Sequence, residues 1–392
     1  MISIKEAIDF VKKHSKPLLK ETTKPVLKAG GYTLYRDIKS PINMPPFRQS
    51  AMDGYAVHLH NKLTYNYIGE IKAGDDVKTT LKPGDAVRIF TGAAVPDTAN
   101  AVMMQEKATV NGNKVVFEIN PNLNQNIRDL GEQVKTGATA LKKDTKLTPA
   151  AIGYLTTLGI TQVSVYKKPN IALVTTGNEL VKAGQPLPYG KIYESNATML
   201  QSALYNLKFY DITCHTIEDD YNKTKDMLHK VIKNNDLILI TGGISVGDYD
   251  FVGKALLELQ TEQIFYKVKQ KPGKPLFFGK KENALIFALP GNPAAALTCF
   301  YIYVHIALQK MMNRTDIELP RIKAKSKSEF FKKGDRPQFL KAIHTSTGIE
   351  ILEGQSSAML QTFAVSNALV YVPHNVNQIH INDELEVILL PQ

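Results

Sequence analysis

Three apolar runs in the second half of the chain, each followed by a loop that contains glycine, constrain the fold most strongly. They are residues 171–174, followed by Thr175-Thr176-Gly177; residues 237–240, followed by Thr241-Gly242-Gly243; and residues 286–289, followed by Pro290-Gly291-Asn292-Pro293. Continuous apolar strands that alternate with helical stretches, such as residues 196–207, are typical of parallel sheets buried on both faces. The pattern predicts a doubly wound α/β domain, in which ligands bind beyond the carboxyl ends of the strands.

The second of these loops carries the strongest functional signal. It reads Thr241-Gly242-Gly243-Ile244-Ser245-Val246-Gly247-Asp248-Tyr249-Asp250. Glycines after a buried strand let backbone N–H groups turn toward a phosphate, and carboxylates at positions i and i+2 could hold a divalent cation. A glycine-rich turn is more often plain loop geometry, so this interpretation depends on what else converges on the loop.

The third loop and a group of lysines also suggest anion binding. Asn292 and Pro293 suit the N-cap and first position of a helix, whose free N–H groups would point at an anion over Gly291. Lys267, Lys269 and Lys271 alternate and are followed by Lys274. As a strand, the first three would share one face, which is either a solvated edge or a row that faces phosphate.

The remaining pattern predicts several further domains in a chain of 392 residues. Residues 4–29 look helical, and residues 41–137 are β-rich, with Asn111-Gly112 marking a hairpin. Residues 147–158 return to helix. After Asn313 the chain is β-rich again, which predicts a small barrel or sandwich.

The composition excludes several classes of function. A formal net charge of +11 favours anionic partners, but the lysines are scattered and form no basic tail, which argues against nucleic acid. No run is apolar and long enough for a secretory signal or a membrane span, so a cytoplasmic protein is expected. Cys214 and Cys299 are interpreted as buried thiols in a reducing compartment, and the nine histidines show no ligand spacing.

Two carboxylates outside the glycine loops have ordinary explanations when each is taken alone. Asp53 precedes Gly54 in the stretch Ser50-Ala51-Met52-Asp53-Gly54-Tyr55-Ala56-Val57, which reads as an Asp-Gly turn that leads into a strand. Asp219 and Asp220 stand where a strand gives way to a helix, and N-capping explains at least one of them.

Taken together, six motifs occur in the order seen in one family. They are Ser50 to Val57, Thr91-Gly92-Ala93, Thr176-Gly177-Asn178-Glu179-Leu180, Gly242 to Asp250, Lys271-Pro272-Gly273-Lys274-Pro275 and Leu289-Pro290-Gly291-Asn292-Pro293. The chain resembles the molybdopterin molybdenumtransferases, the family of MoeA and the gephyrin E-domain. The resemblance covers nearly the whole length.

The resemblance implies a homodimer of four-domain subunits. The domains would be a helical linker domain (1–43 and 136–168), an inserted β-rich domain (44–135), a doubly wound molybdopterin-binding domain (169–317) and a C-terminal β-barrel (318–392). The implied reaction inserts molybdenum from molybdate into adenylylated molybdopterin, with Mg2+, and releases AMP. Transient contacts with a molybdopterin adenylyltransferase and with molybdoenzymes would accompany it.

The family also implies the roles of individual residues. The catalytic residues would be Asp53, Thr91, Glu179, Asp219, Asp250, Lys267 and Lys271. The residues that bind the pterin substrate would be Arg128, Gly177, Gly242, Gly243, Ser245, Gly247, Lys274, Pro290, Gly291, Asn292 and Pro293. The carboxylates for Mg2+ would be Asp248, Asp250 and Glu179. The resemblance also implies that Asp53 and Thr91 of one subunit act in the site of the other subunit.

Two positions depart from the family pattern, and two other functions compete. Gln133 stands where an aspartate is usual, and Ala295 replaces a small hydroxyl residue, so backbone N–H groups would have to bind any anion there. The alternatives are a dimeric protein-binding scaffold of the gephyrin kind and a molybdopterin adenylyltransferase.

Overall fold

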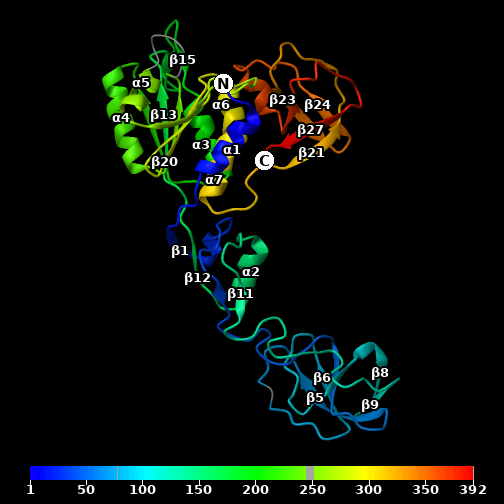
Figure 1. Cartoon of the computed structure of the whole chain (residues 1–392). Coiled ribbons are helices and arrows are strands. Elements are labelled where there is room, and N and C mark those ends of the chain that lie inside the picture. Colours follow the sequence, from blue (N-terminus) through cyan, green and yellow to red (C-terminus); the bar gives the residue numbers. More distant parts are fainter. Residues whose placement is uncertain (77, 244–250, 392) are drawn as a thin grey trace. The chain divides into compact units, whose positions relative to one another are not determined.

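The computed structural model describes residues 1–76, 78–243 and 251–391, which form two compact units (Figure 1). One unit contains Met1–Thr22 and Tyr166–Gln392, and the other contains Thr23–Val165. Each unit is described by itself. In the described residues, no helix is long and apolar enough to cross a membrane.

A six-stranded sheet organises the first unit. Its order is β16 (Ile212–Ile217), β13 (Ile171–Thr176), β17 (Leu237–Thr241), β20 (Ala284–Leu289), β19 (Phe277–Lys281) and β18 (Glu262–Tyr266). The first four strands are parallel, which confirms that the three apolar runs lie in one parallel sheet. Strand β19 is antiparallel to both of its neighbours, β20 and β18. Only two residues separate β19 from β20, and so short a loop joins antiparallel strands.

Helices lie on both faces of this sheet (Figure 1). Alternate strand residues, such as Val174 and Ile240, share a core with α4 (Tyr221–Asn234) and α5 (Phe251–Glu258). On the other side, α3 (Asn196–Asn206) packs against β13, and α6 (Pro293–Cys299) packs against β20. The strands are buried on both faces, as their unbroken apolar sequence predicts.

The buried helix after β20 is longer than α6. It continues through a π-helical turn, Phe300–Val304, into α7 (His305–Met311), and α1 (Ile4–His14) packs against α7. The prediction of a helix over residues 4–29 was wrong beyond His14. Ser15 is extended and Lys16 precedes a proline, which disfavours helix, and Glu21–Pro25 forms strand β1.

A five-stranded antiparallel sheet ends the chain. Its order is β21 (Arg321–Lys325), β27 (Glu384–Leu389), β25 (Ala368–Val372), β23 (Gln338–Thr345) and β24 (Gly348–Ile351). A bridge between Ser326 and Ile349 brings the two edges together, so the sheet is curled. The helix α8 (Leu360–Ala364) and the pair β22 (Phe330–Phe331) and β26 (Gln378–Ile379) complete this region.

The second unit is built on another six-stranded sheet. Its order is β7 (Ala101–Met104), β4 (Gly54–Val57), β6 (Asp85–Ile89), β5 (Thr64–Ile71), β9 (Lys114–Phe117) and β8 (Ala108–Asn111). The register pairs Asn111 with Lys114, which confirms the predicted hairpin. The predicted helix near residues 147–158 is α2 (Pro149–Thr157), capped by Thr148. Two small pairs, β3 (Gln49–Ser50) with β10 (Ile127–Arg128) and β2 (Ile38–Lys39) with β11 (Thr139–Leu141), lie outside the sheet.

The two cysteines have different environments, so the expectation of two buried thiols was wrong for one of them. Cys299 is buried on α6, and this burial raises its pKa to about 12. Cys214 is exposed on β16. The reason is that β16 is an edge strand of the sheet, a position that the sequence alone does not reveal.

We therefore expect one cysteine to react in the folded protein. Iodoacetamide should modify the exposed Cys214, slowly at neutral pH because desolvation and the nearby Glu194 raise the pKa of its thiol. Cys299 should react only after unfolding, because its thiol is buried and protonated. Peptide mass spectrometry before and after urea treatment measures both sites, and Cys214→Ser is the control. Modification of Cys299 in the native protein would contradict the described packing.

Candidate functional site

A cavity of about 760 Å³ lies at the carboxyl ends of the parallel strands. Its floor is formed by Thr176 at the end of β13, Thr241 and Gly242 at the end of β17, and Pro290 to Pro293 after β20. Thr175 pairs with Thr241 and Thr241 pairs with Leu289, so the strands end at one level. The three predicted loops therefore meet at one site.

Glycine is required where these loops touch. Gly242 has φ +83°, and a Cβ added there would lie 2.2 Å from the carbonyl oxygen of Thr176. A Cβ on Gly243 would lie 2.5 Å from Thr176 Oγ1. Larger residues would separate β13 from β17 at the cavity floor. Both glycines thus have a packing role, whatever the ligand.

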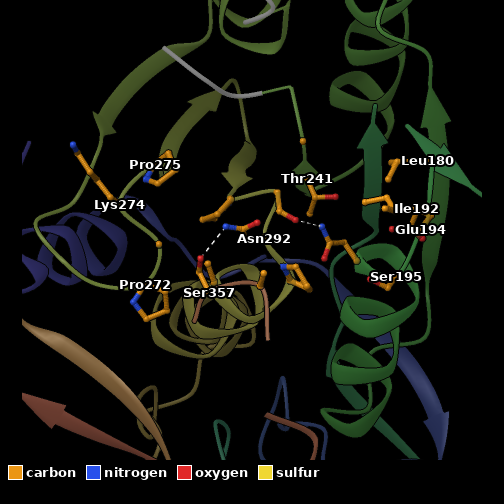
Figure 2. A pocket seen from close by; sticks show the side chains of 18 of the residues that line it. Leu180, Ile192, Glu194, Ser195, Thr241, Pro272, Lys274, Pro275, Asn292 and Ser357 are labelled. Carbon is orange, nitrogen blue, oxygen red and sulfur yellow. Dashed lines mark hydrogen bonds between the residues drawn. The ribbon is translucent and has the colours of Figure 1, made fainter. Parts of the chain in front are cut away.

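Three further segments form the walls of the cavity (Figure 2). One wall comes from β14 (Leu180–Val181), β15 (Ile192–Tyr193) and the start of α3. Opposite it in Figure 2 lies the loop from Lys271 to Pro275. The third wall belongs to the C-terminal region and contains Arg336, Gln355, Ser357 and Ala358.

The cationic loop is held from behind by a buried amide. Gln270 is fully buried, and its Nε2 donates hydrogen bonds to the carbonyl oxygens of Pro272 at 3.0 Å and Gly273 at 3.2 Å. The hydroxyl of Tyr303, on the π-helical turn, donates to Gln270 Oε1. Arg336 Nη1 donates to the carbonyl oxygen of Gln270 at 3.0 Å. The loop that presents Lys271 and Lys274 is thus fixed by contacts behind the cavity.

The lysines do not form the predicted row. Residues 267–274 are not a strand, and Lys267 has φ +66° with its ammonium 4.8 Å from the centre of the Tyr266 ring. Lys269 forms an ion pair with Asp335 at 3.2 Å. Lys271 and Lys274 line the cavity, whereas Lys267 and Lys269 do not. The nearby prolines explain the difference, because proline has no N–H to donate to a sheet.

The start of α6 differs from the expectation of free N–H groups. Asn292 is the N-cap and Pro293 opens the helix, as predicted. However, the N–H groups of Ala294 and Ala295 donate to the carbonyl oxygen of Ser357, at 3.1 and 3.3 Å. Asn292 Nδ2 donates to Ser357 Oγ at 2.8 Å (Figure 2). The first turn of α6 is therefore capped by the C-terminal region and does not offer these two donors to an anion.

The predicted carboxylates occupy different places. Glu179 lines the cavity, and its carboxylate lies against Gly177, where an added Cβ would be 2.6 Å from Glu179 Oε2. Asp219 does not line it; Asn178 N–H donates to Asp219 Oδ2 at 3.1 Å, and Asp219 N–H donates to Asn178 Oδ1 at 3.0 Å. Asp220 is the N-cap of α4, as expected. Asp219 thus links the loops that follow β13 and β16.

A magnesium site does not emerge from the described part of the chain. There, no three His, Cys, Asp or Glu side chains come together in a way that could hold a metal. Glu179 is the one predicted ligand that is described, because Asp248 and Asp250 lie outside the described residues. The same holds for Ser245 and Gly247. The residues described do not by themselves fit a metal ion.

The second unit brings Asp53, Thr91 and Arg128 around strand β3. The N–H and Oγ1 of Thr91 both donate to Asp53 Oδ1 at 2.7 Å, and the Thr91 N–H bond is the main reason that the pKa of Asp53 is lowered. Gly92 N–H donates to the carbonyl oxygen of Ser50, and Arg128 pairs with Gln49. Asp53 is therefore an exposed, ionised carboxylate with a fixed orientation.

Sequence reasoning missed several residues of the cavity. Arg336, Gln355 and Ser357 come from the C-terminal region, and Tyr193, Glu194 and Asn196 come from the wall beside α3. Asn196 Nδ2 donates to the carbonyl oxygen of Gly291 at 2.8 Å. None of them lies in a recognisable local motif, although Arg336 is a cation beside a Gly-Asp turn.

The hydrogen bonds of Gln270 with Tyr303 and with the Pro272–Gly273 backbone predict how substitutions change the stability of the protein. Tyr303→Phe leaves Gln270 Oε1 buried without its donor, so it should lower the free energy of unfolding by about 1–3 kcal/mol. The double variant with Gln270→Met should lose less than the sum of the single losses, because the residues share one hydrogen bond. Urea unfolding measures this cycle. Tyr301→Phe on the same turn is the control, and additive losses would contradict the network.

Family models and curated relatives match most of this chain. Family models match residues 2–159 as the MoeA N-terminal region (domain I and II), residues 172–310 as a probable molybdopterin binding domain, and residues 323–390 as the MoeA C-terminal region (domain IV). A molybdopterin molybdenumtransferase of Nostoc sp. is 32% identical over 380 residues, 93% of this chain and 87% of the relative. One of Haemophilus influenzae is 39% identical over 288 residues, 72% of this chain and 71% of the relative.

A solved structure shows the same fold over the whole chain. The molybdopterin biosynthesis MoeA protein from Pyrococcus horikoshii OT3 has 27% sequence identity and a TM-score of 0.85, and the match covers 99% of this chain and 100% of that one. The three family models together span most of the sequence. The chain therefore belongs to the MoeA family and is an enzyme of molybdenum cofactor biosynthesis.

Proposed function

We propose that this chain is a molybdopterin molybdenumtransferase, which inserts molybdenum from molybdate into adenylylated molybdopterin and releases AMP. The observation that carries the proposal is the cavity in which Lys271, Lys274 and Arg336 line one site at the carboxyl ends of the parallel strands. Curated relatives bear the same name. The cavity volume of about 760 Å³ suits a ligand of cofactor size.

The charge of the cavity suits the chemistry of this reaction. Molybdate and the phosphates of the adenylylated substrate are all anions, and their mutual repulsion opposes the approach of one to the other. Cations that are already in place lower that cost without reorganisation during the reaction. Lys271, Lys274 and Arg336 supply these cations, while Glu179 supplies a carboxylate in the same cavity.

The same proposal includes the subunit organisation, the metal ion and the partner proteins that the family resemblance implies. The protein would be a cytoplasmic homodimer of four-domain subunits with a doubly wound pterin-binding domain and a C-terminal β-barrel. Mg2+ would be bound by Glu179, Asp248 and Asp250 and would supply charge neutralisation at the phosphate. A molybdopterin adenylyltransferase would deliver the substrate, and molybdoenzymes would receive the product.

Asp53 and Thr91 would serve the cavity of the partner subunit in that homodimer. The carboxylate of Asp53 supports this assignment, because two hydrogen bonds from Thr91 fix its orientation and lower its pKa. Such a carboxylate is a weaker base than an ordinary aspartate, so it is suited to orienting a group through hydrogen bonds.

A single assay tests the proposal against the alternatives. Purified protein mixed with adenylylated molybdopterin, Mg2+ and molybdate should release AMP only when molybdate and Mg2+ are both present. Chromatography of the nucleotides measures the release. A scaffold would release no AMP, and a molybdopterin adenylyltransferase would instead adenylylate free molybdopterin with ATP. Either result would overturn the insertase.

Subunit mixing tests the placement of Asp53. Asp53→Ala should stop molybdate-dependent AMP release while adenylylated molybdopterin still binds, and Lys271→Met should also be inactive. Equal amounts of the two inactive variants, mixed so that subunits exchange, should recover up to about a quarter of wild-type activity, since half of the dimers would contain one intact site.

Recovery in the mixture requires that residues of two subunits build one site. The control is a mixture of Asp53→Ala with Thr91→Val, since both changes affect the same subunit's contribution and should not complement. No recovery in the first mixture, with subunit exchange verified, would remove the shared site from the proposal. Full activity of Asp53→Ala alone would remove Asp53 from the mechanism.

A further inference from the structure

A loop of the C-terminal region, residues 352–359, is wrapped around the side chain of Lys341. This lysine lies on β23 and is only 4% exposed. Its Nζ donates hydrogen bonds to the carbonyl oxygens of Gly354 at 2.7 Å, Ser356 at 3.1 Å and Met359 at 3.1 Å. An ammonium group has three donors and no acceptor, so these three carbonyl groups satisfy it completely.

The conformation of the loop and the charge of Lys341 depend on each other. Within the described residues, no carboxylate forms an ion pair with Lys341. A buried charge without a counter-ion is tolerated only when hydrogen bonds replace its hydration. The carbonyl groups of Gly354, Ser356 and Met359 provide that replacement only in the observed loop conformation.

Gln355 fixes the same loop through the backbone of Lys341. The N–H of Lys341 donates to Gln355 Oε1 at 2.9 Å, and Gln355 Nε2 donates to the carbonyl oxygens of Lys341 at 2.8 Å and Leu352 at 2.7 Å. The main chain of Lys341 therefore holds Gln355, and its side chain holds Gly354, Ser356 and Met359.

This loop is also one wall of the candidate site. Gln355, Ser357 and Ala358 line the cavity, and the carbonyl oxygen of Ser357 caps Ala294 and Ala295 at the start of α6. The Ser357 hydroxyl accepts from Asn292 (Figure 2). The loop thus connects the C-terminal sheet to the cavity floor. Its position determines the contacts between this wall and the start of α6.

We propose that Lys341 is a positioning residue of this enzyme, which sets the affinity for the oxyanion substrate by holding the 352–359 loop against α6. The inference rests on the proposed function for its substrate and on the hydrogen-bond geometry for its mechanism. Lys341 does not line the cavity, so its effect passes through Gln355 and Ser357. Its ammonium also places a fixed positive charge behind the wall, which favours anions.

A second buried lysine provides a matched control. Lys332, in the same C-terminal region, is 3% exposed, and its Nζ donates to the carbonyl oxygens of Pro373 at 3.1 Å and His374 at 2.6 Å. Neither Pro373 nor His374 lines the cavity. Lys332→Met therefore removes a buried ammonium and its carbonyl contacts without changing the wall.

The experiment compares Lys341→Met, Lys341→Arg and Lys332→Met in the full chain, with two readouts. One is AMP release as a function of molybdate concentration. For Lys341→Met we expect the KM for molybdate to rise by about tenfold or more, because a displaced wall misplaces the anion. Lys341→Arg should restore most of the wild-type KM, since it keeps the charge and several donors. Lys332→Met should keep the wild-type KM even if it lowers the melting temperature.

The second readout is amide hydrogen exchange without substrate. Ala294 and Ala295 N–H groups donate to Ser357, so Lys341→Met should speed their exchange, whereas Lys332→Met should not. If Lys341→Met does not fold, Gln355→Met replaces it, because that variant frees the loop and keeps the ammonium.

The outcomes separate the two proposals. An unchanged KM and unchanged exchange in Lys341→Met, or equal effects of Lys341→Met and Lys332→Met, would overturn the positioning role. A wild-type protein that releases no AMP would overturn the proposed function, while the exchange comparison would still decide whether Lys341 holds the wall.

Discussion

The close approach of backbone segments around Thr176 is the constraint on which the site depends. Gly242 and Gly243 pack against the Thr176 carbonyl and side chain at distances that exclude any Cβ, and a Cβ on Gly291 would lie 4.0 Å from Gly242 Cα. Since the parallel strands are in register, they end at one level and their loops form the floor of the cavity. The walls, which carry the charge, can then surround a space large enough for a ligand.

Two buried side chains hold two walls of the cavity in place, although neither lines the cavity. Gln270 holds the carbonyl groups of the loop that presents Lys271 and Lys274, and Lys341 holds those of the loop that carries Ser357. Buried polar groups are costly unless they are fully paired. Each set of hydrogen bonds therefore stabilises one loop conformation, because other conformations would leave these groups unpaired. The loop that presents Lys271 and Lys274 is thus held by hydrogen bonds to backbone carbonyl groups, which a change of surface charge would leave intact.

The predictions from sequence succeeded where the pattern is local. The strands that end at Thr176, Thr241 and Leu289, the hairpin at Asn111-Gly112 and the N-cap at Asn292 follow from neighbouring residues. The wall that contains Arg336 and Ser357 could not be predicted, because its residues meet the cavity only through the packing of a distant sheet. The prediction of a strand with a row of lysines on one face was wrong, because it gave the alternation of lysines more weight than the prolines beside them.

The capping of α6 by Ser357 changes how an anion can be bound in this chain. With Ala294 and Ala295 N–H groups engaged and no hydroxyl at Ala295, the partial charges of the helix start are already satisfied within the protein. Full charges on Lys271, Lys274 and Arg336 line the cavity instead. Gln270 holds the loop that carries Lys271 and Lys274, and Arg336 donates to the carbonyl oxygen of Gln270, so all three cations depend on one buried residue.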